Sequence, residues 1–443
     1  MTNAANWDMI VLGGTVLTME EGREPIENGA VAIADGTIAA VGPAKELLDL
    51  APTGELINAA SCIVMPGLVN THSHLAMTLL RGIADDLPLK EWLEGHIWPA
   101  EKVHMKRDTV RLGTELAVLE QLRAGVTTTT DMYFFGDEVC AVLAEAGMRG
   151  VVAESLIDFP TPRCATTDEM FARQRELLEA FRNHPLITPS VAAHAPYSVS
   201  ATNLVKEAEL AEEYEVPMQI HLAEARWEVE RSLAEKGMSP VAYLADLGVL
   251  SERTVAAHCV HVSPEDIELL LEFEVGVAHN PVSNLKLASG VSPVPAMVAR
   301  GVKLGLGTDG AASNNTLDLL RDAQIASLLH KGVAGSPTVL PARTIVELAT
   351  VGGARVLGLE GRIGVLRVGM EADLVCLDTA RPHATPIYDP FSHLVLAACA
   401  ADVRHVLVRG RVVVRDWKAT TIDEERVRAL ATEAAARIQG TTA

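Results

Sequence analysis

Eight short apolar runs recur between residues 65 and 310, and each is followed by a segment with helical periodicity. Runs that are apolar on both faces are typical of buried parallel strands joined by crossover helices. Eight of them predict an α/β fold, a (β/α)8 barrel of the TIM type. The runs are MPGLVNTH (65–72), GVTTTTDM (125–132), GVVAESL (150–156), ITPSVAAHA (187–195), PMQIHLAE (217–224), TVAAHCV (254–260), VGVAHN (275–280) and KLGLGTDG (303–310).

The flanking segments consist of short strand-like runs separated by turns. Asp35-Gly36 lies between two of them, and this pair is a strong signal for a type I′ hairpin turn, which needs positive φ. Similar runs return at 369–378 and 403–414, and a helix is expected from about Asp423. Because the ends of a domain usually lie near each other, we expect both segments to form one small β-sandwich. The predicted division is 1–66 and 366–443 for the sandwich with its terminal helix, and 67–365 for the catalytic barrel.

Charge and hydropathy exclude several classes of protein. The formal net charge of −21 disfavours binding to nucleic acid or anionic membranes. No apolar run reaches the ~18 residues of a membrane span, and the first residues lack the parts of a signal peptide. Six scattered cysteines without a C-x-x-C pair are typical of reduced thiols. We therefore expect a soluble, cytoplasmic protein.

Two histidines, His72 and His74, end the first run. Alternate residues of a strand point to the same side, and at the carboxyl end of a barrel strand this side is the active-site mouth. His221, His258 and Asp309 end the fifth, sixth and eighth runs in the same way. Each alone is as readily a core histidine or a turn aspartate. Together they predict a metal site, because imidazole and carboxylate groups bind divalent metals.

Glu224 follows His221 by three residues. In a continuing strand these two side chains would face opposite sides. A strand that ends near Leu222 would let the loop return the carboxylate to the metal site. The alternative is a glutamate in the first turn of a helix, where the helix dipole favours it. We favour a catalytic role because the other residues of the set are present.

Six longer stretches carry a more specific signal. They are PGLVNTHSHLAMTLLRGIADDLPLKEWLEGHIWPAE (66–101), HAPYSVS (194–200), HLAEARWEVE (221–230), NPVSNLKLASG (280–290), GTDGAASNN (307–315) and GRIGVLRVGMEADLVCLD (361–378). Through them the chain resembles the amidohydrolase superfamily, and within it the 5′-methylthioadenosine/S-adenosylhomocysteine deaminases of the ATZ/TRZ-like group. The resemblance implies a hydrolytic deaminase that forms the inosyl product and ammonia from methylthioadenosine, S-adenosylhomocysteine or adenosine. Guanine or cytosine deaminases and s-triazine amino- or chlorohydrolases are the alternative, and a catalytically inactive barrel scaffold is a remote one.

The resemblance also implies a role for each residue at the mouth. One divalent metal would be held by His72, His74, His221 and Asp309. Zn²⁺ is the expected ion, and the same ligands would accept Fe²⁺ or Mn²⁺. His258 would bind the attacking water or serve as a fourth imidazole ligand. Glu224 and Asp309 would transfer protons. The run ITPSVAAHA lacks the lysine that bridges two metals in binuclear relatives, so we expect one metal.

Three further residues would bind a purine nucleoside according to the resemblance. His194 would contact the base, Glu101 would take the ribose hydroxyls, and Trp98 would line the pocket. Without the resemblance, they would be interpreted as a turn histidine, a solvated helix glutamate and a core tryptophan. A ribose-binding carboxylate has no role with a free base, so Glu101 discriminates between the alternatives. We also expect a homo-oligomer.

The chain departs from the family at the end of the third run. Members of the family often carry arginines there that meet the carboxylate of the homocysteine group. Glu154 and Ser155 occupy part of this region, and Arg163 is the nearest cation. We therefore expect methylthioadenosine to be used more efficiently than S-adenosylhomocysteine.

Overall fold

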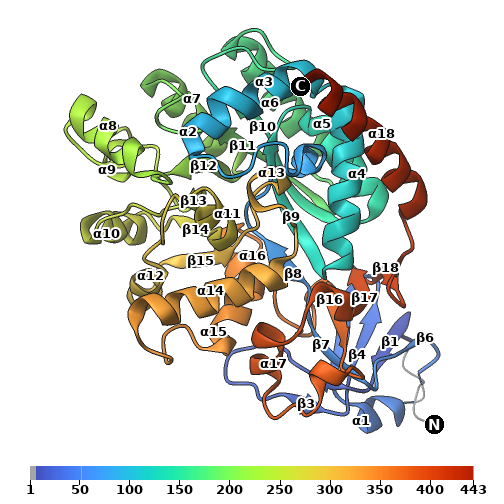
Figure 1. Cartoon of the computed structure of the whole chain (residues 1–443). Coiled ribbons are helices and arrows are strands. Elements are labelled where there is room, and N and C mark those ends of the chain that lie inside the picture. Colours follow the sequence, from blue (N-terminus) through green and yellow to red (C-terminus); the bar gives the residue numbers. More distant parts are fainter. Residues whose placement is uncertain (1–5, 51, 443) are drawn as a thin grey trace.

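A parallel sheet of eight strands forms the centre of the molecule (Figure 1). The computed structural model describes residues 6–50 and 52–442. The strands are neighbours in chain order, and Thr71 N–H donates to the carbonyl of Leu306 (2.9 Å), which joins the first strand to the last. The eight predicted runs are thus confirmed as the strands of a (β/α)8 barrel. They are β8 (Leu68–Asn70), β9 (Val126–Tyr133), β10 (Arg149–Leu156), β11 (Ile187–Ala193), β12 (Met218–Leu222), β13 (Thr254–His258), β14 (Gly276–His279) and β15 (Lys303–Leu306).

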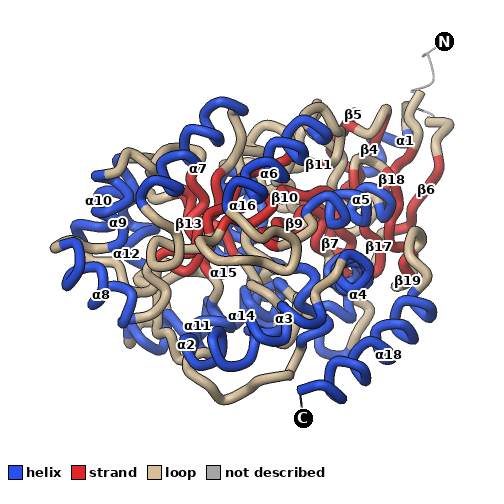
Figure 2. Tube along the Cα trace, turned by 90° about the horizontal axis from the view of Figure 1, so that it is seen from above, coloured by secondary structure: helices blue, strands red, loops and turns tan. Residues whose placement is uncertain are grey.

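Helices surround the barrel strands (Figure 2). Their starts follow local capping rules: Ser263 accepts a hydrogen bond from Asp266 N–H (3.1 Å) and Pro264 is the first helical residue of α10. The helices are α4 (Arg107–Arg123), α5 (Gly136–Ala146), α6 (Thr167–Phe181), α7 (Ala201–Tyr214), α8 (Arg226–Lys236), α9 (Pro240–Asp246), α10 (Pro264–Glu272), α11 (Pro281–Lys286), α12 (Val294–Arg300), α13 (Ala311–Asn314), α14 (Leu319–Ala334), α15 (Ala342–Glu347) and α16 (Gly353–Val356).

The connection between β8 and α4 is long and helical. It runs through the 3₁₀ segment η1 (Leu75–Leu80), α2 (Leu89–Glu91), the π-helical η2 (Trp92–Ile97) and α3 (Trp98–His104). Its inward side chains are buried, among them Leu75, Trp92 and Ile97. Because this connection starts at the carboxyl end of β8, it carries Trp98 and Glu101 to the mouth of the barrel.

Two further sheets confirm that the flanking segments come together. The strand orders are β5-β4-β1-β6 and β19-β18-β17-β16-β7-β2-β3, so N- and C-terminal strands share the second sheet. The turn at Asp35 and Gly36 has φ of 51° and 75°, as a type I′ turn requires. The bounds are β1 (Met9–Leu12), β2 (Thr15–Val16), β3 (Ile26–Glu27), β4 (Gly29–Ala34), β5 (Thr37–Pro43), α1 (Ala44–Leu48), β6 (Glu55–Asn58), β7 (Cys62–Pro66), β16 (Leu374–Asp378), β17 (Val403–Val408), β18 (Arg411–Arg415) and β19 (Lys418–Ala419). The divisions at residues 66 and 365 stay predictions.

A single residue, Gly67, separates sandwich strand β7 from barrel strand β8. A Cβ atom on this glycine would lie 2.1 Å from Oγ1 of Thr127, closer than side-chain atoms can approach. Its N–H donates to the carbonyl of Asp373 (3.0 Å), on the C-terminal side of the sandwich. The sandwich therefore continues directly into the strand that precedes His72 and His74.

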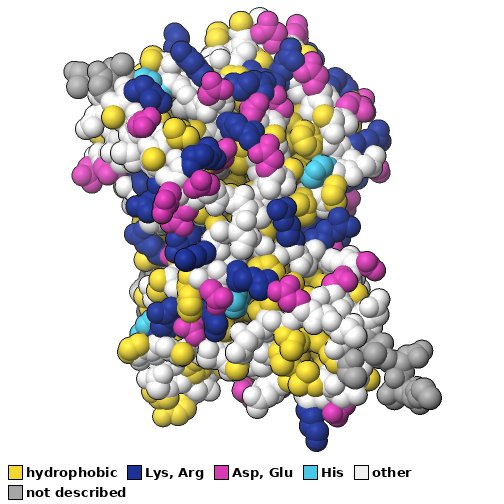
Figure 3. All heavy atoms as spheres, turned by 90° about the vertical axis from the view of Figure 1, so that its right-hand side faces the viewer, with side chains coloured by type: hydrophobic (Ala, Val, Ile, Leu, Met, Phe, Trp, Pro, Cys, Tyr) yellow, Lys and Arg dark blue, Asp and Glu magenta, His cyan; other side chains and the backbone are white. Residues whose placement is uncertain are grey.

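The two C-terminal helices pack on the barrel rather than within the sandwich. α17 (Pro390–Leu396) lies against α14 and α15, and α18 (Glu424–Thr442) runs along α4, as the dark red helix in Figure 1 shows. Glu424 pairs with Arg123 (2.9 Å), and Arg426 pairs with Glu115 (2.7 Å). Acidic and basic side chains are interspersed over this face (Figure 3). Within the described residues, no helix is both long and apolar enough to cross a membrane.

Candidate active site

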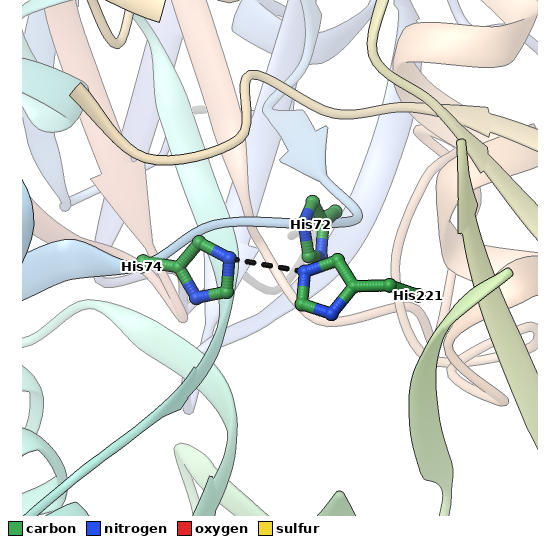
Figure 4. A group of neighbouring side chains, drawn as sticks. All are labelled: His72, His74 and His221. Carbon is green, nitrogen blue, oxygen red and sulfur yellow. Dashed lines mark hydrogen bonds between the residues drawn. The ribbon is translucent and has the colours of Figure 1, made fainter. Parts of the chain in front are cut away.

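The polar residues at the strand ends converge at the mouth of the barrel. Nε2 of His72 and Nε2 of His74 each lie 3.3 Å from Oδ1 of Asp309, and Nε2 of His74 lies 3.2 Å from Nε2 of His221. Figure 4 shows the rings of the three histidines gathered around one point. The structure thus brings together side chains that are up to 237 residues apart, as 309 − 72 = 237. His258, at the end of β13, completes the cluster, with its ring centroid 5.3 Å from that of His72.

Hydrogen bonds fix the orientation of three of these imidazoles. In each ring, Nδ1 is bonded to an oxygen that only accepts, so Nδ1 carries the proton and Nε2 is a free lone pair. These bonds join His74 to Met132 O (2.8 Å), His221 to His194 O (2.7 Å) and His258 to Asn284 Oδ1 (2.8 Å). Free Nε2 atoms directed toward one point are the arrangement that a metal ion requires.

Burial keeps His72, His74 and His221 neutral. It lowers the pKa of His72 to about 4 and also lowers the pKa values of His74 and His221. Burial alone would raise the pKa of Asp309, but the imidazoles of His72 and His74, each 3.3 Å from Oδ1, hold this pKa well below its usual range. At neutral pH the site therefore presents neutral imidazoles and one carboxylate.

This donor set fits one divalent ion. The ligand atoms of His72, His74 and His221 lie within 4.8 Å of one another, and so do those of His72, His258 and Asp309. Nε2 of His72 is buried and has no hydrogen-bond partner. A zinc ion bonds imidazole nitrogen at about 2.0–2.1 Å, so atoms about 3.3 Å apart can share it. The mouth of the barrel is a histidine-rich metal site.

Glu224 reaches this site because its strand ends early. β12 ends at Leu222, and Ala223 has a left-handed φ of 51°, which turns the chain. Oε2 of Glu224 then lies 3.6 Å from Nε2 of His258, and Ser289 Oγ donates to Oε1 (3.2 Å). Burial raises the pKa of Glu224, which favours the protonated form that can deliver a proton.

Sequence reasoning missed the residues that hold Asp309. Ser283 and Ser313 both donate to Oδ2, at 2.6 and 2.7 Å, and Gly310 N–H donates to Oδ1 (2.7 Å). Asn284, the partner of His258, was missed as well. These residues lie within two of the stretches that carry the resemblance, but their residue types alone give no signal.

A cavity of about 550 Å³ opens beside the metal site. Trp98, Glu101 and His194 line it, together with Ser155. Much of the remaining wall is apolar, which suits a planar ring. These apolar residues include Leu89, Trp92, Ile97, Phe134, Ile157 and Phe159.

Two polar groups in the cavity wall have defined partners. Tyr133 O–H donates to Oε1 of Glu101 (2.6 Å), and burial raises the pKa of Glu101 to about 7. Nδ1 of His194 lies 2.7 Å from Oγ of Ser198, and burial lowers the pKa of His194 to about 3. The cavity thus offers one carboxyl group and one neutral imidazole to a ligand.

Arg163 does not line this cavity. Its Nη1 is bonded to Asp137 (2.5 Å) and to Glu154 (2.8 Å), and only 12% of its side chain is exposed. Glu154 also accepts from Gly136 N–H (2.8 Å). Arg163 and Glu154 thus form an internal ion pair, so this cation has its charge matched within the protein.

A parallel barrel with four imidazoles and a carboxylate at the carboxyl ends of its strands defines the class of metal-dependent barrel hydrolases. The sequence profile of the Amidohydrolase family matches residues 63–413, and the chain belongs to this family.

Two similar proteins are called 5-methylthioadenosine/S-adenosylhomocysteine deaminase. The protein of Syntrophobacter fumaroxidans is 46% identical over 96% of this chain and 98% of its own length. That of Syntrophus aciditrophicus is 43% identical over 95% of both chains. Among solved structures, an adenosine deaminase from Xanthomonas campestris with bound zinc superposes with a TM-score of 0.96 at 39% identity, covering 98% of this chain and 99% of its own.

Proposed function

We propose that this protein is a hydrolytic deaminase of adenine nucleosides that carry a 5′ thioether, with 5′-methylthioadenosine and S-adenosylhomocysteine as substrates and adenosine as a further candidate. The products are the inosyl nucleoside and ammonia. The observation that carries this proposal is the similarity, over nearly the full length, to deaminases that bear these names. The cavity beside a metal site supports it.

The proposed metal ligands are His72, His74, His221 and Asp309. Three neutral imidazoles and one carboxylate are the donor set of a mononuclear zinc site with room for a water molecule. The zinc-containing neighbour supports Zn²⁺ over Fe²⁺ and Mn²⁺. When bound, the ion would supply Lewis-acid activation of water.

Proton transfer falls to the chain's own residues. Asp309, held ionised by its neighbours, accepts the proton of the attacking water and later returns one to the leaving amine. Glu224, whose pKa is raised by burial, protonates N1 of the purine so that the ring can accept electrons at C6. His258 is held by Asn284 and directs Nε2 toward Glu224 and the attacking water. Each positioned acid or base contributes roughly 10²–10⁴-fold to the rate.

The cavity wall provides selectivity for a nucleoside. Glu101, with Oε1 held by Tyr133, presents its second carboxyl oxygen to the ribose hydroxyls. His194 contacts the base, and Trp98 lies in the wall beside it. A guanine, cytosine or triazine ring lacks the ribose hydroxyls that Glu101 would bind, so a buried carboxyl at this place favours a nucleoside over a free base.

We also propose a cytoplasmic location. All six cysteines are free thiols, which supports a reducing compartment. The predicted homo-oligomer stays a prediction.

One assay tests the proposed function. The loss of adenine absorbance is followed with adenosine, methylthioadenosine and S-adenosylhomocysteine, and product formation with guanine and a triazine, while metal content is measured on the same sample. We expect turnover of methylthioadenosine and about one equivalent of zinc per chain. Turnover confined to a free base or a triazine would contradict the substrate, and a protein without stoichiometric metal or turnover would be a scaffold.

The identity of the ion is tested by removal and replacement. A chelator should abolish turnover, and Zn²⁺, Fe²⁺ and Mn²⁺ are then added separately. We expect Zn²⁺ to restore activity at the lowest concentration, since imidazole-rich tetrahedral sites favour it. A preference for Mn²⁺ would contradict the assignment.

A further inference from the structure

A second cavity, of about 520 Å³, adjoins the cavity of the proposed active site. The two share five wall residues: Leu93, Glu94, Trp98, Phe159 and Tyr197. Four of these are large apolar or aromatic side chains. A ligand that passes along this common wall would reach from the proposed nucleoside site into the second cavity.

The two cavities differ in charge. Among the described residues that line the first, Lys102 is the one lysine or arginine. The second is lined by three basic residues, Lys90, Arg231 and Lys236. It also has acidic lining residues, including Glu94 and Glu228. This mixture of basic and acidic side chains suits a ligand group that carries a positive and a negative charge.

Two buried polar atoms in the wall of the second cavity lack partners. Nε1 of Trp227 and Oε2 of Glu228 are buried without a hydrogen bond. Glu228 is only 4% exposed, and its other oxygen accepts from Ala225 N–H (2.8 Å). Buried polar atoms in native proteins are nearly always paired. An unpaired donor and an unpaired acceptor in one cavity indicate a polar ligand.

We propose that the second cavity binds the α-amino acid end of a long 5′ substituent, as in S-adenosylhomocysteine, with Lys90 and Arg231 on the carboxylate and Glu228 on the ammonium group. This proposal rests on the proposed function. It places the cations on α2 and α8, because Arg163 is already paired with Asp137 and Glu154.

The ion pair of Arg231 does not prevent this role. Its Nε lies 2.8 Å from Oε1 of Glu235, and both side chains are about half exposed, at 49% and 51%. Exposed pairs one helical turn apart contribute little stability, so Arg231 can exchange this partner for a ligand carboxylate. Lys90 is the middle residue of α2 and is exposed, so its side chain can move toward the same group.

The test uses the intact, metal-loaded protein and the variant Lys90→Met/Arg231→Met. The measured quantity is kcat/KM for S-adenosylhomocysteine divided by kcat/KM for methylthioadenosine. We expect this ratio to fall about tenfold or more, since each lost charge-assisted hydrogen bond weakens binding by that order. Arg226→Met, on the same helix but outside the cavity lining, is the matched control and should leave the ratio unchanged.

A second measurement separates charge from packing. Higher ionic strength should lower the wild-type ratio and have little effect on the ratio of the double variant, because salt screens exposed charges. An unchanged ratio in the double variant overturns the proposal, and so does a wild-type protein that deaminates methylthioadenosine but not S-adenosylhomocysteine. The latter result leaves the proposed function intact, whereas a wild type that deaminates neither nucleoside removes both.

Discussion

The two ends of the barrel each bury a polar cluster, and the clusters differ in how they are satisfied. At the amino end, Arg149 is the first residue of β10, is 1% exposed, and pairs with Asp373 (2.9 Å) and Glu371 (2.5 Å). Asp373 also accepts from the N–H of Arg409 (2.7 Å). At the carboxyl end, Nε2 of His72 is buried without a hydrogen-bond partner among the described residues, and Oδ1 of Asp309 lies 3.3 Å from it.

Burial of ionisable groups costs free energy at both ends. At the amino end the protein itself offsets this cost with bonds that join barrel and sandwich. At the carboxyl end the atoms are preorganised for a ligand. A buried polar cluster therefore indicates function when the protein leaves its polar atoms without partners, and stability when the protein supplies those partners.

The largest effect is expected on activity, from a substitution at the carboxyl end of the barrel. Asp309→Asn keeps the size of the side chain but removes the base, so kcat should fall by about 10²–10⁴-fold. Metal content and the denaturation midpoint of the same sample should be measured together with kcat. A near-normal kcat would remove Asp309 from the mechanism, and Asp318→Asn, a helix N-cap outside the site, is the control.

At the amino end of the barrel, a substitution should change the stability of the protein. Arg149→Met leaves the Asp373 carboxylate buried without its cation, so the free energy of unfolding should fall by about 3–5 kcal/mol. Arg362→Met is a matched control, since Arg362 pairs with the same Glu371 at 2.7 Å but is 43% exposed. This control should cost less than about 1 kcal/mol. The measurements are urea denaturation and kcat of the folded fraction. A large loss of kcat at unchanged stability in Arg149→Met would contradict the structural role of this cluster.

A smaller effect is expected at the cavity wall. Glu101→Gln removes the charged acceptor for the ribose hydroxyls, so KM for methylthioadenosine should rise about 10- to 100-fold. Metal content should not change, because Glu101 is no ligand in the proposed site. Wild-type kinetics in this variant would show that Glu101 does not bind ribose.

The smallest effect is a pH dependence of the same contact. Burial raises the pKa of Glu101 to about 7, so this carboxyl gains a proton as pH falls through that value. Below it, KM should rise by at most about tenfold per pH unit, as expected for one protonation. The pKa of His72, about 4, lies outside this window. This rise of KM at low pH should be absent in Glu101→Gln. If it persists in that variant, the titrating group is another residue.

The fold was predictable because barrel strands carry a strong local signal. Runs such as VGVAHN are apolar on both faces, and β14 (Gly276–His279) lies within it. His72, His74, His221, His258 and Asp309 were predicted for the same reason, since each interrupts the end of an apolar run. Glu101, His194 and Trp98 were predicted from the family resemblance instead. Glu224 reaches the site only because β12 ends at Leu222. The sequence did not predict this strand end, so the role of Glu224 was conditional on it.

Partners from distant segments could not be predicted. Ser283 and Ser313 meet Asp309 through helices α11 and α13, and no periodicity relates them. The pairing of Arg163 with Asp137 and Glu154 depends on how the loop after β10 packs against the start of α5. In each case the contact depends on the relative position of segments that have no local signal for it.

The junction at Gly67 has a consequence for protein engineering. A chimera that fused this barrel to a foreign accessory module would need to preserve the two strands on either side of one residue, with no linker that could absorb a mismatch. Any change of strand direction upstream would be transmitted along four residues, 68–71, to the first imidazole. The small sheets therefore fix the position of the histidines at the metal site. Recombination libraries should place their crossover points elsewhere in the chain.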